Sequence, residues 1–278
     1  MSQIFNIPGV FIYIDDVIIV GKTFDEFLDK IRAVLLKARS RRVNIGLQKC
    51  TFTTSNHPIK ILGHVFYKKT RSIDSSRIKT VVELPPPRNI KEVRNFVGSV
   101  SYLRDWLPRI SEELSPIIDL TKGSDSSTRA PPIKSTPDLQ SRFERIKKMI
   151  IDHIPLSLPS KDSKILISTD ASDLAVGGVI WQEMPPGAPA GTPLIDRKVI
   201  PLSFFSRILQ DSQKNWSTIQ KEIYAILLIL TESTLSGFLL SQKLTIFTDH
   251  KKYSLPIFRS GKESYRKAMD PNPSRFLH

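Results

Sequence analysis

The chain has 278 residues, enough for two domains, and its 41 Lys and Arg against 27 Asp and Glu give a formal net charge of +14. Its hydrophobic content of 40% is ordinary for a globular protein, and no apolar run approaches the roughly 20 residues of a membrane span. The single cysteine, Cys50, excludes an internal disulfide and is expected to pack as a small buried residue. So large a positive excess indicates a polyanionic partner, and no membrane partner is expected.

The first predicted element is a hairpin of two short β-strands, over residues 10–14 and 17–20. Asp15 and Asp16 fall where the chain must turn. Ionised carboxylates inside so apolar a run are costly unless they are paired or bind a cation. The alternative is a solvated turn, because Asp is common in turns.

Residues 24–42 have the apolar spacing of an amphipathic helix, with Thr23 as its N-cap. Strands are predicted over 49–54 and 59–67, and Gly63 interrupts the second. A glycine at such a point allows the backbone to approach a ligand closely, or it forms a plain β-bulge. We assign no chemistry to the helix, which is expected to cover a sheet.

The next part of the chain is predicted to be helical. A helix over 90–104 follows the rigid proline run 85–87. Residues 121–137 are rich in Ser, Thr, Pro and Gly and indicate a linker, and a short helix is expected over 139–151. Strands, a helix and a last strand are then predicted in the order 164–169, 175–181, 199–206, 216–231 and 244–248.

The first half contains short motifs: a Y-x-D-D box stands at 13–16, K-C-x-F at 49–52, L-G-H at 62–64 and F-x-G-x-x-x-Y at 96–102. In this order and at this spacing they resemble the polymerase of gypsy-like LTR retrotransposons, and the last motif resembles the thumb of these enzymes. The resemblance implies that Asp15 binds the catalytic metal ions and that Asp16 supports the site. It also implies that Tyr13 packs near the primer end, and that Gly63 lies in a hairpin that holds the primer. His64 in that hairpin either contacts a phosphate or packs.

The second half resembles the ribonuclease H of the same family. T-D-A-S at 169–172, K-E-I-x-A-I at 221–226 and T-D-H-K at 248–251 lie on a strand order that fits this fold. Asp170 and Asp249 are expected at strand ends, and Glu222 beside the apolar stripe of the helix. Three converging carboxylates repel one another unless cations neutralise them, and Mg²⁺ prefers oxygen ligands. Each residue has an alternative: a turn for Asp170, a surface charge for Glu222 and a helix N-cap for Asp249.

The resemblance implies an α+β and α/β architecture. Its expected parts are the C-terminal part of a reverse transcriptase palm over 1–70, thumb or connection helices over 71–120, a linker and short helix over 121–160, and a ribonuclease H-like domain over 161–278. The chain is expected to contain only the later part of the palm, without the first metal-binding aspartate of that domain. The ribonuclease H is expected to stop before its fourth carboxylate.

The implied activities are RNA-directed DNA polymerisation and hydrolysis of RNA in RNA–DNA hybrids, with Mg²⁺ or Mn²⁺. RNA, DNA, their hybrids and other Pol segments are the implied partners, in the cytoplasm, in a virus-like particle or in the nucleus. We do not expect polymerase activity from this chain alone. Two alternatives stay open: a catalytically inactive remnant that binds nucleic acid, and an unstable pseudogene product.

Overall fold

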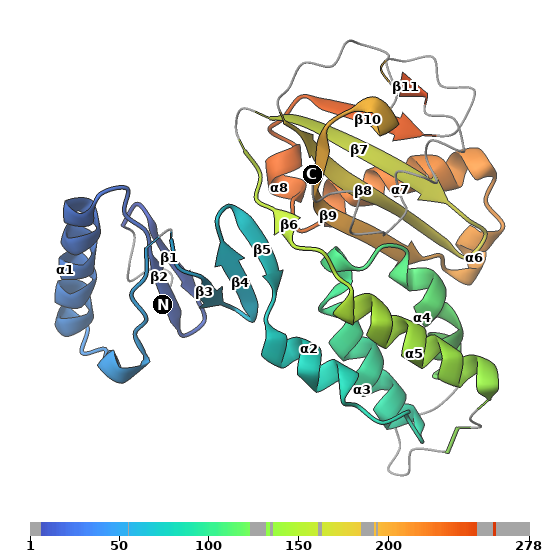
Figure 1. Ribbon diagram of the computed structural model, residues 1–278, viewed down its shortest axis with the longest axis horizontal. Coiled ribbons are helices and arrows are strands. Elements are labelled where there is room, and N and C mark those ends of the chain that lie inside the picture. Colours follow the sequence, from blue (N-terminus) through green and yellow to red (C-terminus); the bar gives the residue numbers. More distant parts are fainter. Residues whose placement is uncertain are drawn as a thin grey trace. The chain divides into compact units, whose positions relative to one another are not determined.

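The computed structural model describes residues 7–54, 56–122, 132–133, 136–160, 163–184, 192, 194–248 and 258–259. The chain divides into two compact units, Met1–Thr54 and Ser55–His278 (Figure 1). The expected limits at residues 70, 120 and 160 stay predictions. In the described part of the chain no helix is both long and apolar enough to cross a bilayer.

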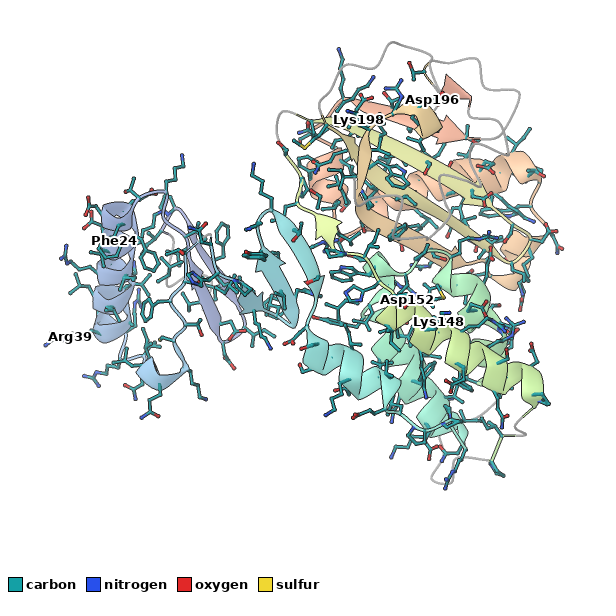
Figure 2. All side chains as sticks on the ribbon, viewed as in Figure 1. Phe24, Arg39, Lys148, Asp152, Asp196 and Lys198 are labelled. Carbon is teal, nitrogen blue, oxygen red and sulfur yellow. The ribbon has the colours of Figure 1, made fainter. Side chains whose placement is uncertain are left out.

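The first unit contains the predicted hairpin and the predicted helix. Strands β1 (Val10–Tyr13) and β2 (Asp16–Ile19) pair in antiparallel register, with Tyr13 opposite Asp16. Helix α1 (Phe24–Ser40) begins at Thr23, whose hydroxyl accepts a hydrogen bond from the backbone N–H of Glu26. Val34 and Ala38 of α1 form a small core with apolar residues of the hairpin. Figure 2 shows Arg39 near the C-terminal end of α1, where its positive charge interacts favourably with the helix dipole.

The strand predicted over 49–54 is absent from the structure. A 3-10 turn, Leu47–Lys49, leads into irregular chain up to Thr54. β-Propensity expresses itself only where a neighbouring strand and a packed face exist, and the described residues offer this segment neither. Cys50 is exposed, which corrects the expectation of a small buried residue.

The second unit opens with a four-stranded antiparallel sheet, β3 (Ile59–Ile61), β4 (His64–Tyr67), β5 (Thr70–Ile73) and β6 (Leu156–Ser157). Leu62 and Gly63 connect β3 to β4 with φ angles of 51° and 78°. Left-handed values at both central residues are typical of a tight hairpin turn. Gly63 is therefore a turn residue, and the alternative of a β-bulge is not observed.

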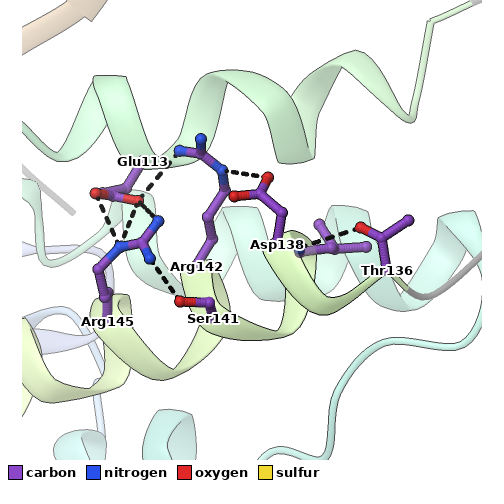
Figure 3. A network of polar contacts seen from close by, with 7 residues as sticks. Glu113, Thr136, Asp138, Ser141, Arg142 and Arg145 are labelled. Atoms are coloured by element: carbon purple, nitrogen blue, oxygen red, sulfur yellow. Dashed lines mark hydrogen bonds and ion pairs between the residues drawn. The ribbon is translucent and has the colours of Figure 1, made fainter.

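Helices follow this sheet. They are α2 (Ser75–Val82), α3 (Ile90–Ser101), α4 (Ile110–Asp119) and α5 (Pro137–Ile151), with a 3-10 turn at Arg104–Trp106. Figure 3 shows how Glu113 of α4 joins α5: its carboxylate accepts hydrogen bonds from Arg142 Nη1 at 3.3 Å and from Arg145 Nη2 at 3.0 Å. A network of this kind stabilises more than isolated surface pairs do.

The second sheet has five strands in the order β11-β10-β7-β8-β9. Their bounds are β7 (Lys164–Ala171), β8 (Ala175–Glu183), β9 (Val199–Ile208), β10 (Leu244–Thr248) and β11 (Phe258–Arg259). β7, β8 and β9 are antiparallel, whereas β10 runs parallel to β7. Helices α6 (Asp211–Lys214), α7 (Thr218–Glu232) and α8 (Ser236–Leu239) lie between β9 and β10, and a 3-10 turn, Leu194–Asp196, lies before β9. The predicted order of strands and helix is confirmed.

Two cores pack against this second sheet. Ala225 and Ile229 of α7 share one core with Ile165 and Ile167 of β7. The other core contains Leu166, Val179, Trp181 and Phe204 of the sheet together with apolar residues of α3, α4 and α5. The helices that precede the sheet in the chain therefore cover side chains that the sheet would otherwise expose.

Candidate active site

Asp170 lies near the end of β7, opposite Gly177 of β8, and its side chain is half-buried. The strand continues through Ala171, two residues beyond the predicted end at residue 169. Side chains alternate along a strand, so Asp170 shares a face with Leu166, which lies in the core common to the sheet and the helices. Asp170 also lines a small pocket, whose other members include Arg109, Glu112, Ser172, Gly177 and Ser206.

Glu222 lies on α7 and is only 2% exposed. Its Oε2 accepts a hydrogen bond from the hydroxyl of Thr248 at 3.1 Å, and Thr248 is the last residue of β10. A carboxylate is seldom buried so deeply without specific partners. The alternative of an ordinary surface charge is therefore wrong for Glu222.

Asp170 on β7 and Glu222, through its partner Thr248 on β10, lie at the same end of the sheet. Phe247 pairs with Ser168 in parallel register, so Thr248, the partner of Glu222, ends level with the last residues of β7, where Asp170 lies. Asp249 falls outside the described residues. Among the described residues no three His, Cys, Asp or Glu side chains gather closely enough to hold a metal ion. The convergence of all three carboxylates stays a prediction.

The turn between β7 and β8 carries Asp173. Lys221, the residue before Glu222, lies 2.8 Å from Asp173 Oδ1. The hydrogen bond and charge of Lys221 hold the pKa of the Asp173 carboxyl below its ordinary value. Asp173 is therefore a charged partner of α7 as well as a turn residue.

Asp15 and Asp16 lie at the exposed tip of the β1–β2 hairpin. Ile14, at the start of this turn, has a φ of 52°, a left-handed value that is a clear outlier for a β-branched residue. Such strain persists only where the surrounding structure imposes it, and it is frequent at functional sites. Tyr13 is also exposed, at 55%.

His64 packs within a cluster of rings. Its imidazole stacks on Tyr102 with ring centroids 5.3 Å apart, and its Nε2 lies 3.2 Å from the Tyr102 hydroxyl. That hydroxyl donates to the carbonyl of Leu62 in the hairpin turn. Burial, reinforced by the positive charge of Arg71, lowers the pKa of His64. These contacts favour the packing role that the sequence left open beside a phosphate contact.

No motif or spacing in the sequence pointed to Arg109 or Glu112. Both come from the start of α4, and Arg109 Nη2 lies 2.8 Å from Glu112 Oε1. Arg109 has a left-handed φ of 54°, which no local pattern in the sequence predicts. Only the packing of α4 against β9 brings the pair near Asp170; in that packing the backbone N–H of Ser111 donates to Ser206 Oγ at 3.1 Å.

Comparisons with known proteins agree with the arrangement of the second unit. Residues 160–269 match the model of the RNase H-like domain found in reverse transcriptase. The chain is 30% identical over 242 residues to the retrovirus-related Pol polyprotein from transposon 297 of Drosophila melanogaster, covering 86% of the chain and 20% of that polyprotein. It is 31% identical over 245 residues to the transposon Tf2-3 polyprotein of Schizosaccharomyces pombe, covering 86% of the chain and 17% of the polyprotein. The chain thus spans about a fifth of the length of these relatives.

Solved structures share the fold. The foamy viral protease-reverse transcriptase in complex with dsDNA superimposes with a TM-score of 0.68 at 18% identity, over 94% of this chain and 52% of that one. The complex of the same viral protein with an RNA/DNA hybrid gives a TM-score of 0.67, over 95% of this chain and 34% of that one. The resemblance to a fragment of a retrotransposon Pol protein with an RNase H-like domain is confirmed.

Proposed function

We propose that this chain, a relative of retrotransposon Pol polyproteins that carries an RNase H-like domain, hydrolyses the RNA strand of RNA–DNA hybrids. The observation that carries the proposal is the buried Glu222 carboxylate, which Thr248 binds at the end of the sheet where Asp170 lies. Burying a carboxylate costs free energy, and catalytic sites are where such costs are retained.

The donor set fits a divalent cation. Asp170 and Glu222 offer carboxylate oxygens, the ligands that Mg²⁺ prefers, and Mn²⁺ accepts the same ligands. With Asp249 as the predicted third ligand, these residues would hold the metal. When bound there, such ions make a water molecule a nucleophile at neutral pH and stabilise the leaving oxygen of the phosphodiester.

The remaining groups orient the carboxylates and the substrate. The Thr248 hydroxyl occupies one lone pair of Glu222 Oε2, which fixes the rotation of that carboxylate. Arg109 places a positive charge in the pocket that Asp170 lines, where it would attract a phosphate of the substrate. The Glu112 carboxylate orients that guanidinium.

We further propose that the hairpin of the first unit is part of a reverse transcriptase palm, and that α3 and α4 belong to the thumb or connection. The exposed face of α3 supports the proposal that this helix binds nucleic acid. Lys91, Arg94, Asn95 and Gly98 recur on it at helical spacing and are exposed, and Tyr102 follows at 43% exposure. Apart from the backbone of α3 itself and the neighbours of Gly98 in the chain, no atom of the described residues lies within 4 Å of where a Cβ of Gly98 would stand, so a nucleic-acid backbone can approach the helix closely there.

Cleavage of a labelled RNA–DNA hybrid by the purified chain, with Mg²⁺ or Mn²⁺, tests the nuclease proposal. The wild-type chain should release RNA fragments, and Asp170→Asn and Glu222→Gln should each reduce this to background. Glu232→Gln is the matched control, because Glu232 ends the same helix and pairs with Arg207 at the surface. Hybrid binding without cleavage at any metal concentration would refute the nuclease and support a remnant that only binds nucleic acid.

Primer extension tests the separate prediction that the chain alone does not polymerise DNA. Template-dependent extension that Asp15→Asn abolishes would contradict it and would assign a catalytic role to the hairpin carboxylates.

A further inference from the structure

Two neighbouring residues of α7 are tied to two different strand ends. Glu222 accepts a hydrogen bond from Thr248, the last residue of β10. Lys221 forms an ion pair with Asp173, in the turn that follows β7. The same turn of α7 is thereby fixed to both strands whose ends carry predicted metal ligands.

The ion pair is asymmetric in its burial. The Lys221 side chain is only 6% exposed, whereas that of Asp173 is 97% exposed. Lysine is almost never buried this deeply unless it is paired, and removing the carboxylate would leave its ammonium group poorly compensated. A lysine that served only solubility would point outward, so the buried position indicates a structural task for Lys221.

Hydrogen bonds within the turn hold the backbone that presents Asp173. The Ser172 hydroxyl accepts hydrogen bonds from the backbone N–H groups of Leu174 and Ala175, at 3.3 and 3.0 Å. The N–H of Ser172 donates to the carbonyl of Ala175 at 2.8 Å. Asp173 therefore stands at a fixed place a short distance along the chain from Asp170.

We propose that the Lys221–Asp173 ion pair is a positioning contact, which sets Glu222 relative to Asp170 for the hydrolysis proposed above. The inference rests on that function for its catalytic consequence. Neither Lys221 nor Asp173 needs to touch substrate for this role. A catalytic pair of carboxylates loses rate steeply when its members are misplaced by even about 1 Å.

The test compares Asp173→Asn, Asp173→Glu and Lys221→Met with a control, Asp211→Asn. Asp211 is likewise exposed, at 75%, and pairs with Lys214 at 2.7 Å in the same unit. We expect Asp173→Asn to lower kcat for hybrid cleavage about tenfold with KM unchanged, since misplacement affects the reacting geometry more than binding. Asp173→Glu should keep most of the wild-type rate. The double variant Asp173→Asn/Lys221→Met should have a kcat no lower than that of Lys221→Met alone.

Amide hydrogen exchange over residues 218–222 gives a readout that needs no activity. Exchange there should quicken in Asp173→Asn and stay unchanged in Asp211→Asn. If the wild-type chain does not cleave but exchange still responds, the proposed nuclease function fails and the anchoring of α7 stands. Unchanged exchange together with unchanged cleavage in Asp173→Asn, or equal loss of cleavage in Asp173→Glu, would overturn the positioning role.

Discussion

The same substitution, glycine to alanine, is expected to have opposite effects at two positions of the second unit. At Gly63 the backbone has a φ of 78°, and an added Cβ would lie 2.9 Å from Tyr102 Oη and 3.2 Å from Arg77 Nε. Tyr102 has little room to move, because His64 stacks on its ring and Arg77 lies over it, 5.2 Å from the centroid. At Gly98, inside α3, an added Cβ would meet no atom of the described residues within 4 Å, apart from the backbone of α3 itself and the neighbours of Gly98 in the chain.

The magnitudes follow from these surroundings. Holding alanine in a left-handed conformation costs about 1–2 kcal/mol, and displacing the Tyr102 hydroxyl from the Leu62 carbonyl costs about 1 kcal/mol more. The smaller entropy of the unfolded alanine chain returns about 0.4–1 kcal/mol. Gly63→Ala should therefore destabilise the unit by about 1–3 kcal/mol, whereas Gly98→Ala should stabilise it by about 0.5–1 kcal/mol.

Urea unfolding followed by tryptophan fluorescence measures both effects. The three tryptophans, Trp106, Trp181 and Trp216, all belong to the second unit, so the signal reports on that unit. The midpoint should fall for Gly63→Ala and rise for Gly98→Ala at an unchanged m-value. A Gly63→Ala variant as stable as the wild type would refute the assigned turn and its clamp on Tyr102. A Gly98→Ala variant that is less stable than the wild type would contradict the exposure of Gly98 on α3.

Other outcomes can be measured on the same protein. The pKa of His64 lies below its ordinary 6.5, chiefly because of burial. As pH drops through 6.5, the unfolded chain therefore binds a proton that the folded chain lacks. The free energy of unfolding should fall over this pH range. His64→Gln should flatten this dependence in urea titrations between about pH 5 and 8, and an unchanged profile would contradict the assignment. Arg94→Gln should weaken hybrid binding and reduce its salt slope by about 1, as measured by fluorescence anisotropy, whereas a slope equal to the wild type's would remove Arg94 from the interface. Glu113→Gln should cost about 1–3 kcal/mol by weakening the pairs between α4 and α5, and an unchanged midpoint would show that the network adds nothing.

Local chemistry explains what the sequence predicted correctly about the fold. The α1 helix was found from its apolar stripe and from Thr23, whose cap is observed. The strands of the second sheet were found because their apolar runs are long and end at turn residues. The prediction of a strand over 49–54 was wrong, because strand formation depends on a neighbouring strand that the local sequence does not reveal. Helix α2 was missed although Asp74 caps it and accepts a hydrogen bond from the N–H of Ser76.

The candidate site divides in the same way. Asp170 and Glu222 could be named from motifs, and their elements place them as the fold requires. The burial of Glu222, the partner of Lys221 and the approach of Arg109 to Asp170 could not be named, because each depends on contacts between elements far apart in the chain.

The core that the second sheet shares with α3, α4 and α5 has a consequence for how this part of the chain is made and how it can be cut. These helices leave the ribosome before the strands and can present an apolar surface on which the sheet assembles as it emerges. An expression fragment that starts at residue 160, where the family match starts, would lack that surface and expose Trp181 and Phe204 to water and to other copies. A fragment that starts before Ile90 is longer, keeps these side chains covered and is therefore expected to remain monodisperse.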